Sequence, residues 1–427
     1  MDYREHRTPT DLPKPPLTRR ERARKAAGRF FTAGLVLLLL ILLYLGFFPV
    51  PADNPTGSSG EIHAQQAQCE RRLGTRSLTP ATHTVGLGRS IQVVLDQAQP
   101  GDTVLVPYDV YGESLRLETD ALTLRGLPQA GQRPVLEGMG RLENGIVACA
   151  DGITIEGIEL RNFTGNGVLM QDVDRGTIRD VFANHTGEYG LFVLRSQQAV
   201  VENSAASGAS DTGIYVGQSR DVVVRGNEAF DNVSGLEVEN SSGVLVEDNH
   251  AHDNTAGILV FLLPDLEVKQ TSGNTVRGNR VLDNNLENFA PEEEIVSNVP
   301  AGTGILIMAA DRTEVTGNEI RGNRSVGVAV IGLRQLLPDR ATFDVGTEPE
   351  RNWIHGNTYS ENGGAPDPAL SAAGLRGADL LWDASGWDNL WSEPSATRFP
   401  QVLPGPELPA FVRRGLWRVL VILRDLS

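Results

Sequence analysis

Two glutamates, Glu237 and Glu239, stand two residues apart in the segment GLEVEN, and this spacing could support chemistry. In a β-strand, residues two apart point to the same side, with their Cα atoms about 6.5 Å apart. Two carboxyl groups at such a distance can divide the roles of general acid and general base, as they do when a glycosidic bond is cleaved. An ordinary solvated strand edge is the competing interpretation.

Asp211, in the preceding segment, could bring a third carboxyl group to the same side. We therefore take Asp211, Glu237 and Glu239 as the candidate catalytic residues. Glu188 lies one further segment upstream. The candidate substrate-binding residues are the nearby aromatic and polar ones: Phe192, Arg195, Tyr215 and Gln218.

Aromatic and apolar residues recur at outward positions of the same segments, which is unusual for an exposed face. Either inserted loops and the C-terminal tail pack on these side chains, or the side chains stack on sugar rings. We expect packing from Leu259 to Met308 and stacking at Phe192 and Tyr215.

His250 and His252 also alternate, so both imidazoles should share one side of a strand. A zinc site needs at least three protein ligands, and the sequence shows no third one near them. No Asp cluster with calcium-ligand spacing occurs either. We therefore predict two solvent-exposed histidines, no metal site and no cofactor.

These residues lie within a repeat. VRGNEAFDN at 224–232 and VEDNHAHDN at 246–254 are followed by similar segments at 276–284, 315–323 and 354–362. Between them recurs a glycine with an apolar triplet, as in GIYV at Gly213 and GLEV at Gly235. A period of 22 to 23 residues with short β-branched strands predicts one coil of a parallel β-solenoid, with Ile, Val and Leu stacked inside.

The paired asparagines of the repeat fit bends between strands, where each amide can donate to one neighbouring coil and accept from the other. We give them a structural role only. The predicted ladder contains Asn227, Asn232, Asn249, Asn254, Asn279, Asn284, Asn318, Asn323, Asn357 and Asn362.

Three insertions interrupt the repeat, after Gly257, after Val276 and after Gly327. All three border the strand that carries the apolar triplet. Because function is usually placed on loops over a rigid scaffold, we expect these insertions to wall a groove on that face.

Five regions are predicted along the 427 residues: a basic cytoplasmic tail (1–29), a transmembrane helix (30–48), a flexible stalk rich in Pro, Gly and Ser (49–84), the all-β solenoid (85–365), and an irregular C-terminal tail that packs on or caps the solenoid (366–427). Residues 90–99 read as a short helix that caps the first coil. LWRVLVILRDL near the C terminus is expected to form a cap helix, with a membrane-surface patch as the alternative.

FFTAGLVLLLLILLYLGFF at 30–48 contains no charge and is long enough to cross a bilayer. Its basic N-terminal flank places the tail in the cytoplasm and the body outside, in a single-pass protein of the cell membrane. A cleaved signal peptide is the alternative, but its apolar stretch would be shorter. Outside the cytoplasm, Cys69 and Cys149 could form a disulfide or remain two free thiols.

The net charge of −16 divides into +5 for residues 1–29 and −21 for the rest. An acidic body without a basic stripe excludes nucleic acid as a partner, since binding to phosphates needs clustered Lys and Arg. The expected partners are the membrane and either a polysaccharide or an envelope protein.

The segments SGASDTGIYVGQSRDVVVRGN and NFAPEEEIVSNVPAGTGILIMA, with the entry IQVVLDQAQPGDTVLVP, resemble bacterial right-handed parallel β-helix repeat proteins of the pectin-lyase-like superfamily. The resemblance covers about residues 85–362. It implies a right-handed solenoid related to pectate lyases, alginate C5-epimerases and periplasmic proteins that assist copper-site assembly. It supplies no reaction, because one fold hosts many functions.

Two functions stay open. The sequence favours a membrane-anchored, noncatalytic scaffold that binds polysaccharide or another envelope component. The alternative is a polysaccharide lyase, hydrolase or epimerase with its groove on the triplet strand. Absence of the Asp-Pro-His triplet of alginate epimerases disfavours epimerisation. Two cysteines, four methionines and no clustered ligands disfavour metal-cofactor assembly.

Overall fold

The structure is a computed structural model that describes residues 79–292, 294–338 and 340–425. Its contacts divide the chain into two units, 51–408 and 1–50 with 409–427. The first unit contains the solenoid. The described part of the second consists of the helix α5 (Ala410–Asp425), so a helix forms where the sequence predicted one.

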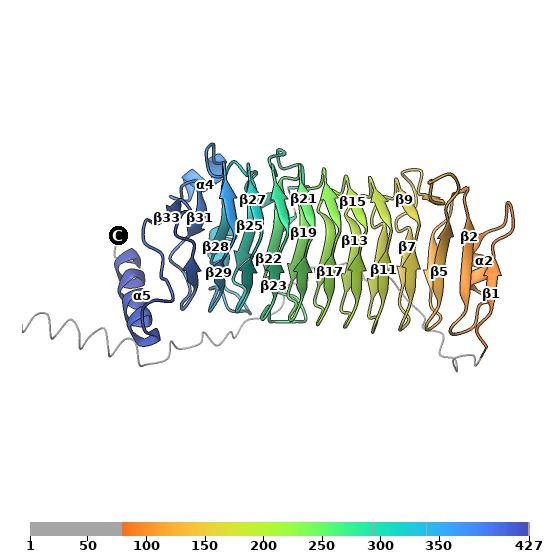
Figure 1. The fold of residues 1–427 in the computed structure, drawn as a ribbon, viewed down its shortest axis with the longest axis horizontal. Helices are drawn as coiled ribbons and strands as arrows, with labels where there is room; N and C mark the ends of the chain where they lie inside the picture. The colour runs from red at the N-terminus through yellow and green to blue at the C-terminus, as the bar shows by residue number, and fades with distance from the viewer. Residues whose placement is uncertain (1–78, 293, 339, 426–427) are drawn as a thin grey trace, which may run out of the picture. The chain divides into compact units, whose positions relative to one another are not determined.

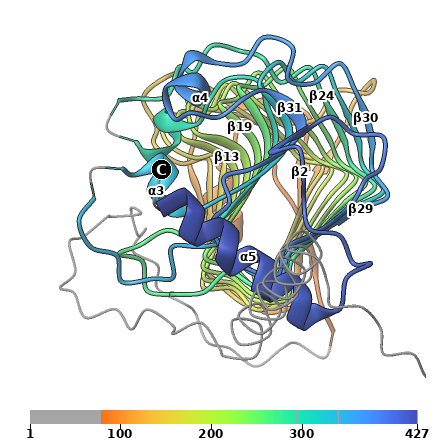
Figure 2. The ribbon, with the colours of Figure 1, turned by 90° about the vertical axis from the view of Figure 1, so that its left-hand side faces the viewer.

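Each complete coil of the solenoid contributes one strand to each of three parallel sheets, and the coils at the two ends are incomplete (Figure 1). In a typical coil, β17 (Val223–Arg225) and β18 (Glu228–Phe230) are short, and β19 (Ser234–Glu239), which carries the apolar triplet, is longer. Seen along the stack, the coils superimpose, and the segments with α3 (Leu333–Leu336) and α4 (Pro368–Ala372) lie outside them (Figure 2). The predicted parallel β-solenoid is confirmed.

The twelve-stranded sheet of the described residues contains β1 (Thr82–Thr84), β2 (Thr103–Pro107), β5 (Thr123–Leu127), β8 (Thr154–Glu156), β11 (Thr177–Arg179), β14 (Val200–Glu202), β17, β20 (Leu245–Glu247), β23 (Thr275–Arg277), β26 (Glu314–Thr316), β29 (Trp353–His355) and β32 (Leu390–Ser392). The ten-stranded sheet contains β3 (Val110–Tyr111), β6 (Val135–Glu137), β9 (Glu159–Arg161), β12 (Phe182–Asn184), β15 (Ala205–Ser207), β18, β21 (His250–His252), β24 (Arg280–Leu282), β27 (Glu319–Arg321) and β30 (Thr358–Ser360). The eleven-stranded sheet contains β4 (Leu115–Leu117), β7 (Ile146–Ala148), β10 (Val168–Gln171), β13 (Tyr189–Leu194), β16 (Thr212–Gly217), β19, β22 (Ala256–Phe261), β25 (Thr303–Met308), β28 (Val326–Ile331), β31 (Ala378–Trp382) and β33 (Arg398–Phe399).

Side-chain burial follows from strand alternation. In β17 and β18 the middle side chain, Val224 or Ala229, is buried while its neighbours are half-buried or exposed. Every residue of β19 is buried, so the outer face of the eleven-stranded sheet is covered as well as its inner face. Position 235 in this strand requires glycine because the next coil packs closely against it. A Cβ there would lie 2.6 Å from the carbonyl oxygen of Gly257.

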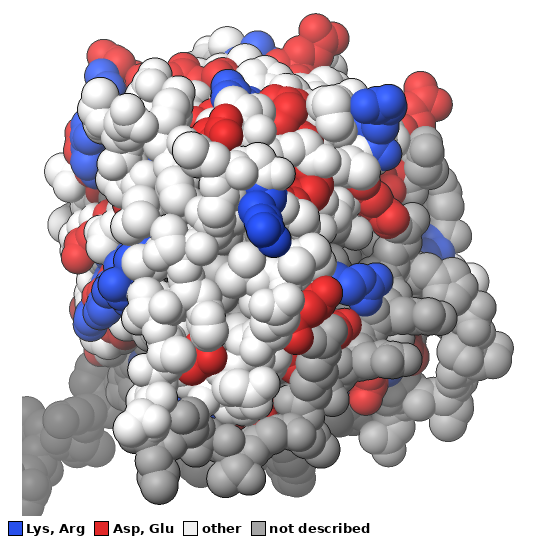
Figure 3. Space-filling view, turned by 90° about the vertical axis from the view of Figure 1, so that its right-hand side faces the viewer, with Lys and Arg blue, Asp and Glu red and all other residues white. Residues whose placement is uncertain are grey.

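The first coil is capped as predicted. The helix α2 (Ile91–Leu95) lies within the expected segment 90–99 and buries Ile91 and Leu95. The N-terminal end of the solenoid shows charges of both signs scattered among neutral groups (Figure 3).

The predicted limits of the solenoid were too narrow. β1 pairs with β2, so the first sheet begins inside the predicted stalk. After residue 365 the chain adds β31 to β28 and β32 to β29, so the tail predicted to be irregular continues the solenoid. β31 and β32 were not predicted because they lack the Gly and Asn spacing of the repeat. They nevertheless pair in the same register as the preceding coils.

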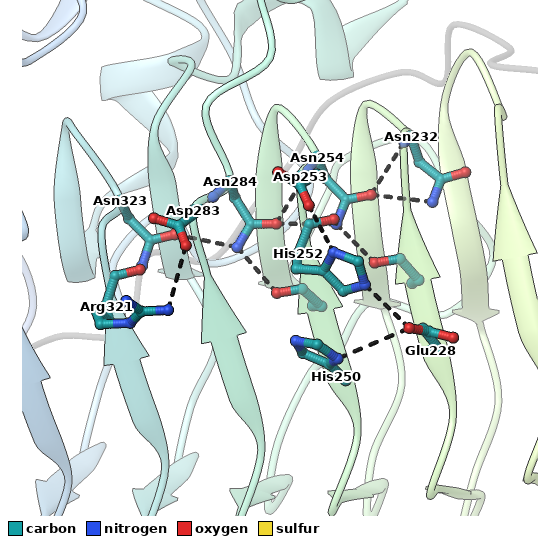
Figure 4. Close-up of polar contacts among 12 residues, drawn as sticks. Glu228, Asn232, His250, His252, Asp253, Asn254, Asp283, Asn284, Arg321 and Asn323 are labelled. Carbon is teal, nitrogen blue, oxygen red and sulfur yellow. Dashed lines mark hydrogen bonds and ion pairs between the residues drawn. The ribbon is translucent and has the colours of Figure 1, made fainter.

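The asparagine ladder forms as predicted (Figure 4). Each side-chain amide nitrogen donates to the amide oxygen one coil later, over 2.8–3.1 Å, in one row from Asn227 to Asn357 and another from Asn232 to Asn362. At these bends the residue before the asparagine adopts the left-handed conformation, as Gly226 does (φ +63°).

The predicted transmembrane segment at 30–48 lies outside the described residues. Among the residues that the structure describes, no helix is long and apolar enough to cross a membrane. Cys149 is buried and disulfide-bonded, which excludes the alternative of free thiols. The sequence holds one other cysteine, Cys69, outside the described part of the chain.

We predict that Asn254→Ala destabilises the solenoid by about 2–4 kcal/mol. The change removes the oxygen that accepts from both the backbone N–H and the side-chain amide of Asn232, at 3.0 Å each, and so leaves two buried donors unpaired. Urea unfolding followed by circular dichroism measures the loss. Asn298→Ala, at an exposed position, is the control and should change stability little; equal effects of the two changes would contradict a structural ladder.

Candidate functional site

The three candidate carboxylates lie together on the outer side of the eleven-stranded sheet. Glu237 and Glu239 both project from β19, and Asp211 directly precedes β16 in the neighbouring coil. Their exposed fractions are 4%, 7% and 6%. The competing interpretation, in which Glu237 and Glu239 lie on an ordinary solvated strand edge, is therefore wrong.

These carboxyl groups line a pocket of about 190 Å³. Its floor is the sheet, and its walls come from the insertion between β22 and β23 and from that between β24 and β25, which includes the 3₁₀ helix η1 (Ile295–Asn298). The prediction that insertions wall this face is confirmed for these two. The lining residues include Asn166, Glu188, Tyr189, Phe192, Asp211, Tyr215, Gln218, Glu237, Glu239, Leu263, Leu266, Glu294 and Ile295.

Thr212 joins two of the carboxyl groups. Its hydroxyl oxygen lies 2.9 Å from Oδ1 of Asp211 and 2.8 Å from Oε2 of Glu237. A hydroxyl has one proton and can donate to only one of them. The other hydrogen bond therefore needs a proton on a carboxyl group, so the Asp211 and Glu237 pair holds at least one proton in this arrangement.

Tyrosine hydroxyls complete the cluster. Tyr189 donates to Asp211 and Tyr215 donates to Glu239. In the sheet register Gly217 stands opposite Glu239. A Cβ at Gly217 would lie 2.4 Å from the ring of Tyr215, so the glycine provides the space in which Tyr215 reaches Glu239.

Burial dominates the electrostatics of the pocket, because a buried carboxyl group resists ionisation. Burial raises the pKa of Asp211 to about 7 and that of Glu239 to about 8. It also raises the pKa of Glu237 well above its usual value, with further increases from the charges of Asp211 and Glu239. The pKa of Glu188 is raised by burial and by Glu294. Among the lining residues that the structure describes, none is Lys or Arg.

The prediction that Phe192 and Tyr215 stack on sugar rings is not supported by their positions in the structure. Phe192 and Tyr215 are 3% and 6% exposed and pack with Tyr189, at ring-centroid distances of 4.5–4.8 Å. Each therefore forms part of the pocket wall and offers no open face for a sugar ring. The expectation for the C-terminal end is confirmed, since Leu259 and Met308 lie in an apolar cluster with inserted and tail residues such as Leu333 and Leu370.

Arg195 and Gln218 are the candidates that the structure places differently. Arg195 is absent from the carboxyl pocket and forms a two-pronged ion pair with Asp172, at 2.8 Å for both bonds. Gln218 lies at the rim, where its amide oxygen accepts from the backbone N–H groups of Glu267 and Val268 and so anchors an inserted loop. Both also line an adjoining open hollow of about 630 Å³.

Sequence reasoning missed Tyr189, Thr212 and Gly217. Each lies on the same strands as a predicted residue, so a column-by-column alignment of the repeats could have found them. It also missed Glu294 and Ile295, which come from an insertion with no counterpart in other coils. No signal in the repeat identifies those two.

Comparison with known proteins supports the fold. Residues 144–264 match the family model described as a right handed beta helix region. The A-modules of the mannuronan C-5 epimerases AlgE4 and AlgE6 of Azotobacter vinelandii are similar, with TM-scores of 0.50 and 0.54, identities of 19% and 18%, 74% of this chain covered, and 93% and 91% of theirs. An alginate lyase from Paenibacillus sp. str. FPU-7 has a TM-score of 0.51 at 14% identity, over 72% of this chain and 99% of its own. The comparison with curated proteins found no match.

At such low identity these likenesses show the fold alone. The protein therefore has the right-handed parallel β-helix fold that the sequence resemblance predicted.

The raised pKa values predict an unusual pH dependence of stability. In the unfolded chain these carboxyl groups ionise near pH 4, so between about pH 4 and pH 8 the folded protein holds protons that the unfolded chain has released. The free energy of unfolding should therefore fall as pH rises through this window. Glu239→Gln, which cannot ionise, should reduce the fall.

Thermal unfolding of the wild type and of Glu239→Gln at about pH 4.5 and about pH 8.5 tests this sign. We expect the variant to be more stable than the wild type mainly at the higher pH. Glu361→Gln, at an exposed site, is the matched control. An equal difference between variant and wild type at both pH values would contradict a buried, protonated Glu239.

Proposed function

We propose that the protein hydrolyses a glycosidic bond of a neutral polysaccharide, with Asp211, Glu237 and Glu239 as its acid and base groups. One observation carries this proposal: three buried carboxyl groups with raised pKa values line a pocket that inserted loops wall. Burying such groups without a cation costs stability, and strongly perturbed groups in a cleft are typical of catalytic sites. This favours an enzyme over the binding scaffold that the sequence alone favoured.

The carboxyl groups divide the work by their proton affinity. Glu239, with a pKa of about 8, carries a proton at neutral pH and gives it to the glycosidic oxygen as the bond to the anomeric carbon breaks. Of the Asp211 and Glu237 pair, Asp211 ionises near neutral pH, since its pKa is about 7, whereas the pKa of Glu237 is raised well above its usual value, so that Glu237 keeps its proton. The Asp211 carboxylate takes a proton from the water that attacks the anomeric carbon.

The charge of the pocket selects the substrate class. Five carboxyl groups line it, from Glu188, Asp211, Glu237, Glu239 and Glu294, and no lysine or arginine of the described residues does. A polymer of uronic acids would bring further negative charge into this field and be repelled. We therefore assign a neutral glycan rather than the anionic polymers named for the epimerases and the lyase of similar fold.

The size of the pocket indicates how the chain binds. A volume of about 190 Å³ is below the roughly 300–1,000 Å³ of common small-molecule sites, so it suits a single sugar residue. The open hollow of about 630 Å³ shares Gln218 with the pocket and is lined mainly by polar side chains. It would take the following residues of the glycan, which makes attack at a chain end the preferred mode.

The proposal places the enzyme at the cell membrane. Residues 30–48 would anchor it, because they combine an uncharged apolar stretch with a basic N-terminal flank. The disulfide at Cys149 supports an oxidising, extracytoplasmic compartment for the solenoid. The substrate would then be a glycan of the cell envelope.

We predict that the full-length protein releases reducing ends from at least one neutral polysaccharide and none from pectate or alginate. Activity should rise as Asp211 ionises near pH 7 and fall as Glu239 loses its proton near pH 8. Glu239→Gln and Asp211→Asn should each lower kcat/KM by about 100-fold or more. A panel of neutral and anionic polysaccharides, assayed for reducing and unsaturated ends, measures this.

Glu361→Gln serves again as the control and should keep full activity, since it is exposed and away from the lining residues. Binding of a glycan without any product, unchanged in Glu239→Gln, would overturn the proposal and return the protein to the class of tethered scaffolds. Unsaturated ends from an anionic polymer would identify a lyase instead.

A further inference from the structure

A second cluster of titratable side chains lies on the ten-stranded sheet, away from the acidic pocket. Glu228 comes from β18, and His250 and His252 come from β21 in the next coil. The parallel register places Glu228 directly beside His250. Figure 4 shows both imidazoles next to the Glu228 carboxylate on the outer side of the sheet. The third ligand that the sequence did not reveal is thus supplied by the neighbouring coil.

The three side chains have the spacing of metal ligands. One donor atom from each lies within 4.8 Å of the other two. Oε1 of Glu228 is 3.2 Å from Nε2 of His252 and 3.9 Å from Nδ1 of His250. Tetrahedral zinc, with bonds of about 2.0–2.2 Å, needs donors about 3.3 Å apart, so small side-chain rotations complete the geometry.

A neighbouring carboxylate orients one ligand. Oδ2 of Asp253 lies 2.7 Å from Nδ1 of His252. With a proton on that nitrogen, the lone pair of Nε2 faces Glu228. Metal-bound histidines are held in this way by a carboxylate on the nitrogen that does not bind the metal.

The second imidazole, that of His250, is also oriented toward the Glu228 carboxylate. Its Nε2 is buried without a hydrogen-bond partner among the described residues, and Nδ1 is the nitrogen directed to Glu228. The charge of Arg280 is balanced by its ion pair with Glu319. The carboxylates of Glu228 and Asp253 therefore give the surroundings of the two histidines a net negative charge.

We propose that Glu228, His250 and His252 bind one divalent transition-metal ion, with water completing its coordination. Two imidazoles and one carboxylate suit zinc and its neighbours, whereas calcium and magnesium prefer all-oxygen sites. The ion would link two adjacent coils on the outer side of the solenoid. This site shares no residue with the acidic pocket, so the metal-binding proposal can be tested independently of the proposed hydrolysis.

The test titrates full-length protein, purified without a histidine tag and freed of metal with EDTA, with Zn²⁺ in a calorimeter and with Co²⁺ in an absorption spectrometer. We expect one Zn²⁺ per chain and a visible Co²⁺ spectrum typical of low coordination number. His250→Ala, His252→Ala and Glu228→Gln should each weaken binding by at least about tenfold, and Asp253→Asn by about tenfold.

His355→Ala is the matched control. His355 lies 2.9 Å from Glu314 of the preceding coil, but no second histidine of the described residues joins them in a metal-binding cluster, so its loss should leave zinc binding unchanged. Absence of stoichiometric zinc binding would overturn the proposal. So would binding that survives His252→Ala, or that is lost equally in the control variant. Circular dichroism of each variant verifies that the solenoid is folded.

Discussion

The parallel register between coils is the constraint on which the other features depend. Backbone hydrogen bonds hold each strand beside the same strand one coil earlier, so side chains one repeat apart become neighbours at about 4.8 Å. Tyr215 therefore lies beside Glu237, and Glu228 beside His250. A single substitution in one coil therefore alters the contacts of the equivalent residues in the two adjacent coils. Chemistry in this fold is consequently assembled across coils rather than within one segment of the sequence.

The same register produces two opposite energetic situations. In the ladder, each buried amide of Asn232 or Asn254 is neutral and has both a donor and an acceptor partner, so burial stabilises the coil. In the pocket, Glu237 and Glu239 are also buried, but they are acids placed near one another. The folded state meets this cost by keeping protons on the carboxyl groups. The bends thus bury neutral, fully paired amides, while the outer face of β19 buries carboxyl groups whose pKa values are raised.

The sequence predicted those parts of the molecule that repeat. Alternation and the Gly and Asn spacing located the strands, the ladder and the three carboxyl groups, because each is a local pattern of one coil. Glu294 and Leu370 could not be placed in this way, since they lie on segments without a counterpart in other coils. Arg195 was wrongly grouped with the residues of the carboxyl pocket. The strand pattern indicates on which side of the sheet a side chain lies, but it does not reveal the ion-pair partner, here Asp172.

The two rows of asparagines have a direction. At every step the amide nitrogen donates toward the C-terminal end, so the amide dipoles add as peptide dipoles add in a helix. The positive end of each row meets a carboxylate: Asn357 donates to Glu393 over 2.8 Å and Asn362 donates to Asp379 over 3.0 Å. Copies of a coil could therefore be inserted within the rows during evolution, lengthening the solenoid, whereas the segment that carries Glu393 and Asp379 must remain last.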